Sequence, residues 1–290
     1  MTLQEAGFFL LNQLRTVYDE GEASAIGDCV MESLTGSDKT ERMIYKNNPI
    51  TAEEEKQLRG YAAKLLQHTP VQYVLNESWF CGLKFYVDEN VLIPRPETEE
   101  LVEWVISNCR FPIDTLSILD IGTGSGCIPI SLKRRLRKAR VTALDISEGA
   151  LTVAKRNAAK LGAELEFIQL DILDPAKWAE LNAADIIISN PPYIPENNKA
   201  SMHPNVLAFE PHIALFVPDQ DALLFYKAII ALAKTKLTAE GLLFFEIHED
   251  LGREVTELLS SEGFASEIKK DMQGKDRMVM GRRDVDRLTS

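Results

Sequence analysis

The chain has 290 residues, enough for two domains, and its 45% hydrophobic content can fill buried cores. Its formal net charge of −12 argues against a broad nucleic-acid surface, because nonspecific affinity for phosphates comes from Lys and Arg side chains. The four cysteines form no Cys-x-x-Cys pair and the four histidines show no metal-ligand spacing, so we expect free thiols, a cytoplasmic protein and no metal. We expect neither a signal peptide nor a membrane span, and no membrane partner.

Residues 1–75 have the apolar spacing of helices, and we expect a small helical bundle that docks a substrate protein. The clearest helix start is Thr51, which Glu54 follows in a capping-box pattern. Residues 76–95 carry β-prone side chains separated by turn residues, which predicts a β-hairpin linker. The second domain is expected over residues 96–283.

After a helix that starts at Pro96, apolar strands and helices alternate along the chain. This alternation is typical of a doubly wound α/β fold with a largely parallel sheet. Two strands around a turn at the end of the chain would add an antiparallel edge. The predicted strands are Leu116–Ile121, Arg140–Ile146, Leu165–Asp171, Ala184–Ser189, Leu242–Ile247, Ala265–Lys270 and Arg277–Gly281, and the predicted helices are Cys127–Arg137, Ser147–Leu161, Asp219–Thr235 and Leu251–Glu262.

A glycine-rich loop follows the first of these strands, with the sequence Gly122-Thr123-Gly124-Ser125-Gly126. Glycines let the backbone pass close to a ligand, and the helix that follows presents free N–H groups to an anion. The third glycine comes one residue too early for the dinucleotide fingerprint, and no Gly-Lys-Ser/Thr follows as in a P-loop. The loop therefore suits a smaller anion, such as an amino-acid carboxylate.

Two carboxylates stand at the ends of the next two predicted strands. Asp145 lies about twenty residues past the loop, where a carboxylate can accept hydrogens from both ribose hydroxyls. Asp171 ends the third strand and could meet an adenine amine. Because the carboxyl ends of parallel strands line one crevice, the implied ligand contains adenosine and an amino acid but no phosphate. We therefore expect S-adenosylmethionine as the cofactor and S-adenosylhomocysteine as its product.

Asn190-Pro191-Pro192-Tyr193 follows the fourth predicted strand. The two prolines fix φ and end the sheet, so Asn190 is held in a stiff turn. The side-chain oxygen of Asn190 and the carbonyl of Pro191 can accept both hydrogens of an NH2 group, and the Tyr193 ring can cover its face. A lone Asn-Pro is ordinary turn chemistry. The four residues together predict a substrate site for a planar amino group, with Asn190, Pro191 and Tyr193 as catalytic residues.

These motifs resemble those of known enzymes. The glycine loop and Asp145 resemble the motifs of class I S-adenosylmethionine-dependent methyltransferases, which implies a seven-stranded, Rossmann-like sheet. The Asn190–Tyr193 motif is similar to that of enzymes that methylate adenine, guanine or glutamine amides. Three further stretches and the helical front domain resemble the peptide chain release factor glutamine methyltransferase (PrmC/HemK) family, namely Thr69–Tyr73, Ile93–Glu99 and Phe209–Pro211.

The resemblance implies methylation of the side-chain amide nitrogen of the glutamine in the Gly-Gly-Gln motif of class 1 release factors. We expect a monomer that binds this protein partner without contacting nucleic acid. Glu97 and Thr98 are assigned to the cofactor, with bracing of the loop as the alternative. Ile172 is also assigned to the cofactor, although the family often has an aromatic residue after the carboxylate that Asp171 supplies here.

Two other functions stay open at this point. The first is a nucleic-acid adenine or guanine amino methyltransferase, which shares the logic of the Asn190–Tyr193 motif. The acidic balance and the lack of an evident basic recognition domain weigh against it. The second is a noncatalytic helical adaptor with a degenerate α/β domain, against which the intact glycine loop and intact Asn190–Tyr193 motif speak.

Overall fold

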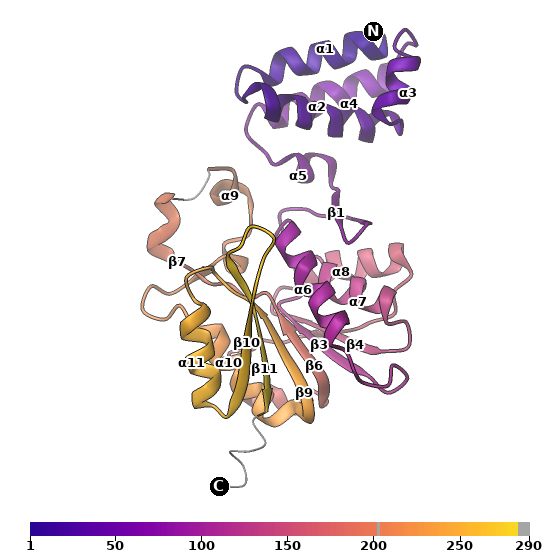
Figure 1. Cartoon of the computed structure of the whole chain (residues 1–290). Coiled ribbons are helices and arrows are strands. Elements are labelled where there is room, and N and C mark those ends of the chain that lie inside the picture. Colours follow the sequence, from indigo (N-terminus) through magenta and orange to yellow (C-terminus); the bar gives the residue numbers. More distant parts are fainter. Residues whose placement is uncertain (202–203, 284–290) are drawn as a thin grey trace. The chain divides into compact units, whose positions relative to one another are not determined.

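The computed structural model describes residues 1–201 and 204–283 of the chain (Figure 1). The described residues divide into two compact units. One unit comprises residues 1–77 together with 204–209, and the rest of the described chain forms the other. The first unit is built from helices, and the second is built around a seven-stranded sheet.

The helical unit is held by leucines from two of its helices and by polar caps. Leu10, Leu14 and Leu58 are fully buried in its core. The predicted capping box is confirmed, because the Thr51 side chain accepts from the Glu54 N–H and the Glu54 carboxylate accepts from the Thr51 N–H. Three short helices were not predicted, because five or six residues show too little periodicity. The helices are α1 (Leu3–Leu14), α2 (Glu20–Thr35), α3 (Lys39–Ile44), α4 (Ala52–Leu65), α5 (Val71–Leu75) and α9 (Pro204–Phe209).

A two-stranded hairpin opens the second unit, formed by β1 (Ser78–Phe80) and β2 (Leu83–Phe85). Cys81 and Gly82 connect the strands with φ values of 48° and 71°. Positive φ at both central residues is what a tight hairpin turn of this twist requires. The remainder of the predicted linker, up to Pro96, contains no further strand.

The central sheet has the strand order β10-β11-β9-β6-β3-β4-β5. Strands β9, β6, β3, β4 and β5 are parallel. At one edge β11 runs antiparallel to both of its neighbours, β9 and β10, so the predicted antiparallel edge is confirmed. The order reverses between β3 and β6, so the chain leaves these two strands in opposite directions, which is where doubly wound sheets bind ligands. The strands are β3 (Ser117–Ile121), β4 (Arg140–Asp145), β5 (Glu166–Gln169), β6 (Ala184–Ser189), β9 (Leu237–Glu246), β10 (Phe264–Lys270) and β11 (Asp276–Arg283).

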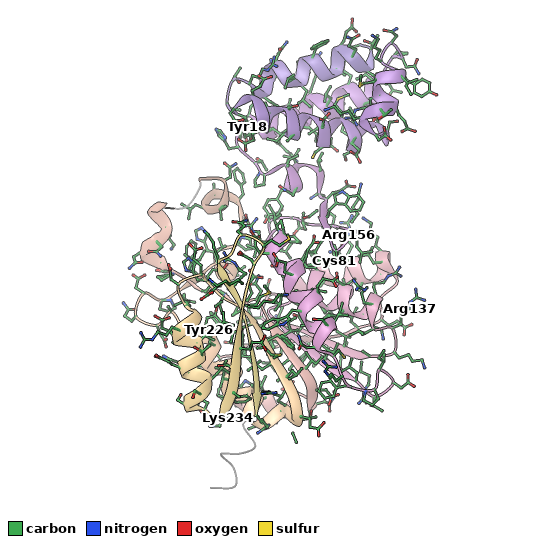
Figure 2. The ribbon with its side chains drawn as sticks, in the orientation of Figure 1. Tyr18, Cys81, Arg137, Arg156, Tyr226 and Lys234 are labelled. Carbon is green, nitrogen blue, oxygen red and sulfur yellow. The ribbon has the colours of Figure 1, made fainter. Side chains whose placement is uncertain are left out.

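Helices cover both faces of this sheet (Figure 1). Alternate side chains of β6 enter opposite layers, with Ile186 and Ile188 in one apolar cluster and Ile187 in the other. Each such buried side chain contributes about 1.5–3 kcal/mol through the hydrophobic effect. Tyr226 is fully buried in the second cluster (Figure 2). The first cluster includes side chains from α6 (Pro96–Asn108), α7 (Cys127–Arg135) and α8 (Glu148–Leu161). The second includes side chains from α10 (Leu224–Lys236) and α11 (Gly252–Ser261).

Several boundaries differ from the predicted ones. Strand β5 ends at Gln169, so Asp171 lies in the loop beyond it. Helix α10 begins at Leu224 rather than Asp219, because the Asp221 side chain accepts the Leu223 N–H at 3.2 Å and forms a turn. Five short elements were not predicted: η1 (Pro175–Glu180), β7 (Ile194–Pro195), η2 (Glu196–Ser201), η3 (His212–Ala214) and β8 (Phe216–Val217). Among the described residues, no helix has the length and apolar character to cross a membrane.

Candidate active site

The glycine loop joins β3 to α7 at the point where the strand order reverses. Gly122, Gly124 and Gly126 have φ values of 76°, 52° and 80°, in the region that favours glycine. A Cβ added at Gly122 or Gly124 would meet no atom within 4 Å, so open space lies beside them. At Gly126 it would lie 2.9 Å from Ile130 Cδ1 and 3.2 Å from Ala154 Cβ. The first two glycines therefore leave room for a ligand, and the third lets α8 pack closely.

A cavity of about 280 Å³ lies over the carboxyl ends of these strands. Six residues that were assigned to the cofactor line it, namely Gly122, Gly124, Asp145, Asp171, Ile172 and Asn190, which is assigned to the substrate as well. The predicted substrate residues Asn190, Pro191 and Pro192 line it as well. The structure thus brings the glycine loop and the Asn190 motif to a single cavity, although 68 positions separate Gly122 from Asn190.

Asp145 is held by the backbone of the two loops beside it. Its Oδ2 accepts the Gly124 N–H and its Oδ1 accepts the Ser147 N–H, both at 2.9 Å. Burial raises the pKa of Asp145, and these hydrogen bonds oppose the rise. Each oxygen keeps a second lone pair. The carboxylate can therefore accept hydrogen bonds from ligand hydroxyls without losing its backbone partners.

The other side of the cavity is apolar around one carboxylate. Ile146, Leu173 and Ile213 line it with 44%, 38% and 57% of their surface exposed. Asp171 lies among them and accepts the Leu173 N–H at 2.8 Å. Large apolar side chains left open around a fixed acceptor suit a planar ring that carries an amine.

A buried polar cluster beneath the glycine loop was not assigned a role from the sequence. Neither carboxylate oxygen of Asp120, nor the hydroxyl of Thr123 or Ser125, has a well-placed hydrogen-bond partner among the described residues. Burial raises the pKa of Asp120 to about 7, and the neighbouring Thr123 hydroxyl opposes the rise. Buried polar groups normally have partners. Asp120 is fully buried and does not line the cavity, so this polar cluster lies beneath the glycine loop and not at the ligand site.

The Asn190 side chain ends a chain of hydrogen bonds from the core. Thr98 Oγ1 donates to Glu246 Oε2 at 2.6 Å, and Asn190 Nδ2 donates to Thr98 Oγ1 at 3.3 Å. Thr98 and Glu246 are only 3% and 2% exposed. Within the described chain, Asn190 Oδ1 and the Pro191 carbonyl oxygen accept no hydrogen bond. Two acceptors are therefore left available on residues that line the cavity.

The structure gives Tyr193 a different place from the predicted one. Its ring meets the His248 ring edge-on at 5.8 Å between centroids and packs on the second apolar cluster. Burial raises its pKa to about 12, so the phenol stays protonated. Neither Tyr193 nor Glu97 lines the cavity, and Thr98, Thr123, Ser125 and Gly126 lie behind its surface. The ring is partly buried and packs at the end of the motif, and its predicted contact with a substrate stays a prediction.

Two motif residues with no assigned role form an ion pair. Arg95 Nη2 lies 2.7 Å from Glu210 Oε1, and the Glu210 side chain is 2% exposed. Glu210 Oε2 also accepts the Ile93 N–H at 3.3 Å. The pair connects the stretch before α6 to the segment between α9 and η3, and it explains why these residue types are needed there.

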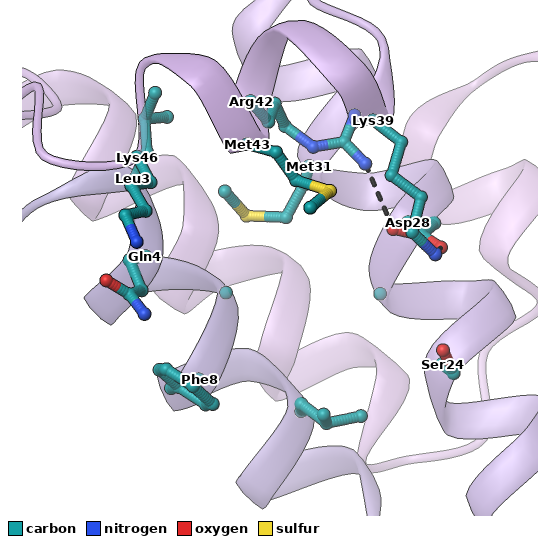
Figure 3. Close-up of a pocket in the computed structure, with 13 residues that line it drawn as sticks. Leu3, Gln4, Phe8, Ser24, Asp28, Met31, Lys39, Arg42, Met43 and Lys46 are labelled. Carbon is teal, nitrogen blue, oxygen red and sulfur yellow. Dashed lines mark hydrogen bonds and ion pairs between the residues drawn. The ribbon is translucent and has the colours of Figure 1, made fainter.

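A second cavity lies within the helical unit, between α1, α2 and α3, and has a volume of about 430 Å³ (Figure 3). Its carboxylate, Asp28, lies 2.7 Å from Lys39 Nζ and 3.0 Å from Arg42 Nη2. Three cations, Lys39, Arg42 and Lys46, line this cavity against one carboxylate. None of the predicted cofactor or substrate residues lines it, so we assign the chemistry to the smaller cavity. In the part of the chain that is described, no three His, Cys, Asp or Glu side chains gather as metal ligands would.

Comparison with known proteins agrees with both units. Residues 101–208 match the family described as methyltransferase small domain, and residues 10–75 match the PrmC N-terminal domain. A methyltransferase structure from Pyrococcus furiosus shares the fold, with 17% identity, a TM-score of 0.51 and coverage of 77% of this chain and 96% of that one.

Two curated relatives match nearly the whole chain. The release factor glutamine methyltransferase of Flavobacterium psychrophilum is 43% identical over 92% of this chain and 94% of its own length. That of Bacteroides thetaiotaomicron is 37% identical over 95% and 98%. With identity at this level running through both units, the chain belongs to the release factor glutamine methyltransferase family.

Proposed function

We propose that this protein transfers a methyl group from S-adenosylmethionine to the side-chain amide nitrogen of the glutamine in the Gly-Gly-Gln motif of class 1 release factors. The names of its relatives support a release factor as the substrate protein. One observation carries the chemistry: two available acceptors, Asn190 Oδ1 and the Pro191 carbonyl, stand at the same cavity as the glycine loop.

The residues around the cavity fit this cofactor. Asp145 suits the ribose hydroxyls, Asp171 and the apolar wall that includes Ile172 suit adenine, and Gly122 and Gly124 leave room for the backbone of the amino acid. When bound, the cofactor supplies an activated methyl group on a sulfonium centre. Its product is S-adenosylhomocysteine.

An amide nitrogen is a poor nucleophile because its lone pair is delocalised into the carbonyl. If Asn190 Oδ1 and the Pro191 carbonyl each accept one amide hydrogen, they favour the partly positive, more tetrahedral nitrogen of the transition state. The two prolines fix φ and so hold these acceptors in place, and the partly buried Tyr193 packs beside them, so that little reorganisation is needed. Neither acceptor is a strong base, so the proton that nitrogen loses passes to water.

We assign substrate docking to the helical unit, residues 1–75, since the catalytic cavity is confined to the other unit. The domain assignment continues with a linker over residues 76–95 and a methyltransferase domain over 96–283. The protein acts as a cytoplasmic monomer that contacts the release factor and not nucleic acid. The alternative, a nucleic-acid amino methyltransferase, is disfavoured because the near full-length relatives carry a protein-glutamine name.

Mass spectrometry tests the proposal directly. The purified protein is incubated with a class 1 release factor and a cofactor that carries a deuterated methyl group. We expect the added mass on the glutamine of the Gly-Gly-Gln motif, and no addition when that glutamine is replaced. RNA and DNA are incubated in parallel. If the nucleic acid were labelled and the release factor remained unmodified, the assignment would be overturned.

A further inference from the structure

An asparagine amide offers two ends of nearly equal size, and only one of them suits the proposed reaction. The oxygen accepts hydrogen bonds, whereas the NH2 group only donates them. Were the Asn190 amide rotated by half a turn, its NH2 group would face the hydrogens of the substrate amide. Something in the protein must therefore select the orientation of this side chain.

Three elements of the methyltransferase unit supply a hydrogen-bonded chain that ends on Asn190. Glu246 is the last residue of β9, Thr98 lies in the first turn of α6, and Asn190 follows β6. The Glu246 backbone is fixed by pairing with β11 and by the Tyr226 hydroxyl, which donates to its carbonyl at 3.1 Å. The Glu246 carboxylate is fully buried, so its position is set by the sheet and not by solvent.

The ionised carboxylate gives this chain a direction. A carboxylate can only accept, so the Thr98 hydroxyl hydrogen points toward Glu246 Oε2 at 2.6 Å. The Thr98 oxygen then presents a lone pair to Asn190, and only the Nδ2 end of the amide can satisfy it, at 3.3 Å. Asn190 Oδ1 is left to face the cavity.

We infer that Thr98 and Glu246 are positioning residues that hold the Asn190 amide with its oxygen toward the substrate. This inference rests on the proposed function, because it explains how one of the two acceptors is presented. It replaces the sequence-based assignment of Thr98 to the cofactor by a role behind the catalytic residue. Neither residue touches the reacting atoms.

The charge state of Glu246 depends on groups from several elements. Burial raises its pKa to about 7, and Glu97 of α6 adds to the rise. The hydrogen bond from Thr98, the positive charge of Arg277 and the nearby Asn190 amide oppose it. Burial raises the pKa values of Tyr193 and Tyr226, and the negative charge of Glu246 adds to the rise, so both phenols stay neutral. At pH 8 the ionised form of Glu246 prevails, and the tests are set at that pH.

A double-mutant cycle separates positioning from a general structural role. Thr98→Val removes the hydroxyl at nearly constant shape, and we expect the single-turnover rate of methyl transfer to fall about tenfold or more. Thr98→Ser keeps the hydroxyl and should restore the rate to within about threefold. In an Asn190→Ala background, Thr98→Val should change the rate by less than about twofold, because its effect passes through Asn190. A Thr98→Val rate like that of the wild type, or fully additive losses, would overturn the inference.

Glu246→Gln provides a second variant that removes a buried charge and so spares the fold. A glutamine amide can donate or accept, so the direction of the chain is no longer fixed. We expect the rate to fall several-fold, to about a third or less of the wild-type value, and this loss also to vanish in the Asn190→Ala background. Losses that persist without the Asn190 side chain would contradict a positioning role.

Nuclear magnetic resonance can test the orientation of the Asn190 amide without a measurement of methyl transfer. The side-chain NH2 signals of Asn190 are identified by their absence in Asn190→Ala. We expect their hydrogens to exchange with water about tenfold faster or more in Thr98→Val than in the wild type or Thr98→Ser. Equal exchange in all three would overturn the inference. If the release factor is not methylated, the proposed function fails, yet this measurement still decides the orientation.

Discussion

Replacement by alanine should lower the stability of the fold much more at Gly126 than at Gly124, two glycines of the same loop. Gly126→Ala places a Cβ 2.9 Å from Ile130 Cδ1 and 3.2 Å from Ala154 Cβ, at a φ of 80°. Overpacking costs about 1–3 kcal/mol, and the left-handed backbone costs about 1–2 kcal/mol more. Reduced freedom of the unfolded chain returns about 0.4–1 kcal/mol. We therefore expect a net loss of about 2–4 kcal/mol in the free energy of unfolding.

Gly124→Ala is the matched control, because its Cβ would meet no atom within 4 Å at a φ of 52°. Only the backbone term remains, so the expected loss is about 1 kcal/mol or less. The new methyl group lies at the cavity, and it should weaken binding of S-adenosylhomocysteine about tenfold or more.

Urea titration followed by tryptophan fluorescence measures the first effect, since Trp104 is buried against Phe244 in the methyltransferase unit. Isothermal titration calorimetry with S-adenosylhomocysteine measures the second. Wild-type stability of Gly126→Ala, or a larger loss of stability in Gly124→Ala than in Gly126→Ala, would refute this account of the loop.

Three further variants test the carboxylates. Asp145→Ala should weaken S-adenosylhomocysteine about tenfold to a hundredfold in calorimetry, since charge-assisted hydrogen bonds to hydroxyls are lost; unchanged affinity would remove the ribose assignment. Arg95→Ala leaves the buried Glu210 without its ion-pair partner and should lower the free energy of unfolding by about 3–5 kcal/mol in urea titration. A loss of less than about 1 kcal/mol, as for an exposed ion pair, would show that Glu210 finds another partner. Asp120→Asn tests the raised pKa of about 7. The folded wild type holds this proton more tightly than the unfolded chain, so its stability relative to the variant is greatest below pH 4 and falls by about 4 kcal/mol as the pH rises through 7. A pH-independent difference would contradict the burial of an ionisable Asp120.

Much of the sheet could be predicted because its strands are apolar runs that end at polar residues. Ala184–Ser189 is predicted and observed with the same bounds, and Asp145 ends β4 as expected. Strand β5 ends at Gln169, before Asp171, because the β-propensity of the residues does not determine which residue makes the last hydrogen-bonded pair of the strand. The two-residue strands β7 and β8 show no periodicity and were not predicted.

The candidate site could be predicted where it follows the strand ends, and not where it depends on distant packing. Thr98 lies 92 positions before Asn190 and 148 before Glu246, and no local pattern reveals that the three are bonded. The ring of Tyr193 was expected at the substrate. In the structure it packs on the second apolar cluster and contacts the ring of His248. Local sequence specifies which residue types stand at a strand end, while tertiary packing decides which way their side chains point.

The single-turnover rate of Asn190→Ala, measured with saturating cofactor and a class 1 release factor, tests the central claim most directly. With Asn190 Oδ1 removed, one of the two acceptors for the amide hydrogens is gone. We predict methyl transfer about a hundredfold slower, equivalent to about 3 kcal/mol, with cofactor affinity unchanged. A rate near that of the wild type would contradict the claim that Asn190 orients the amide.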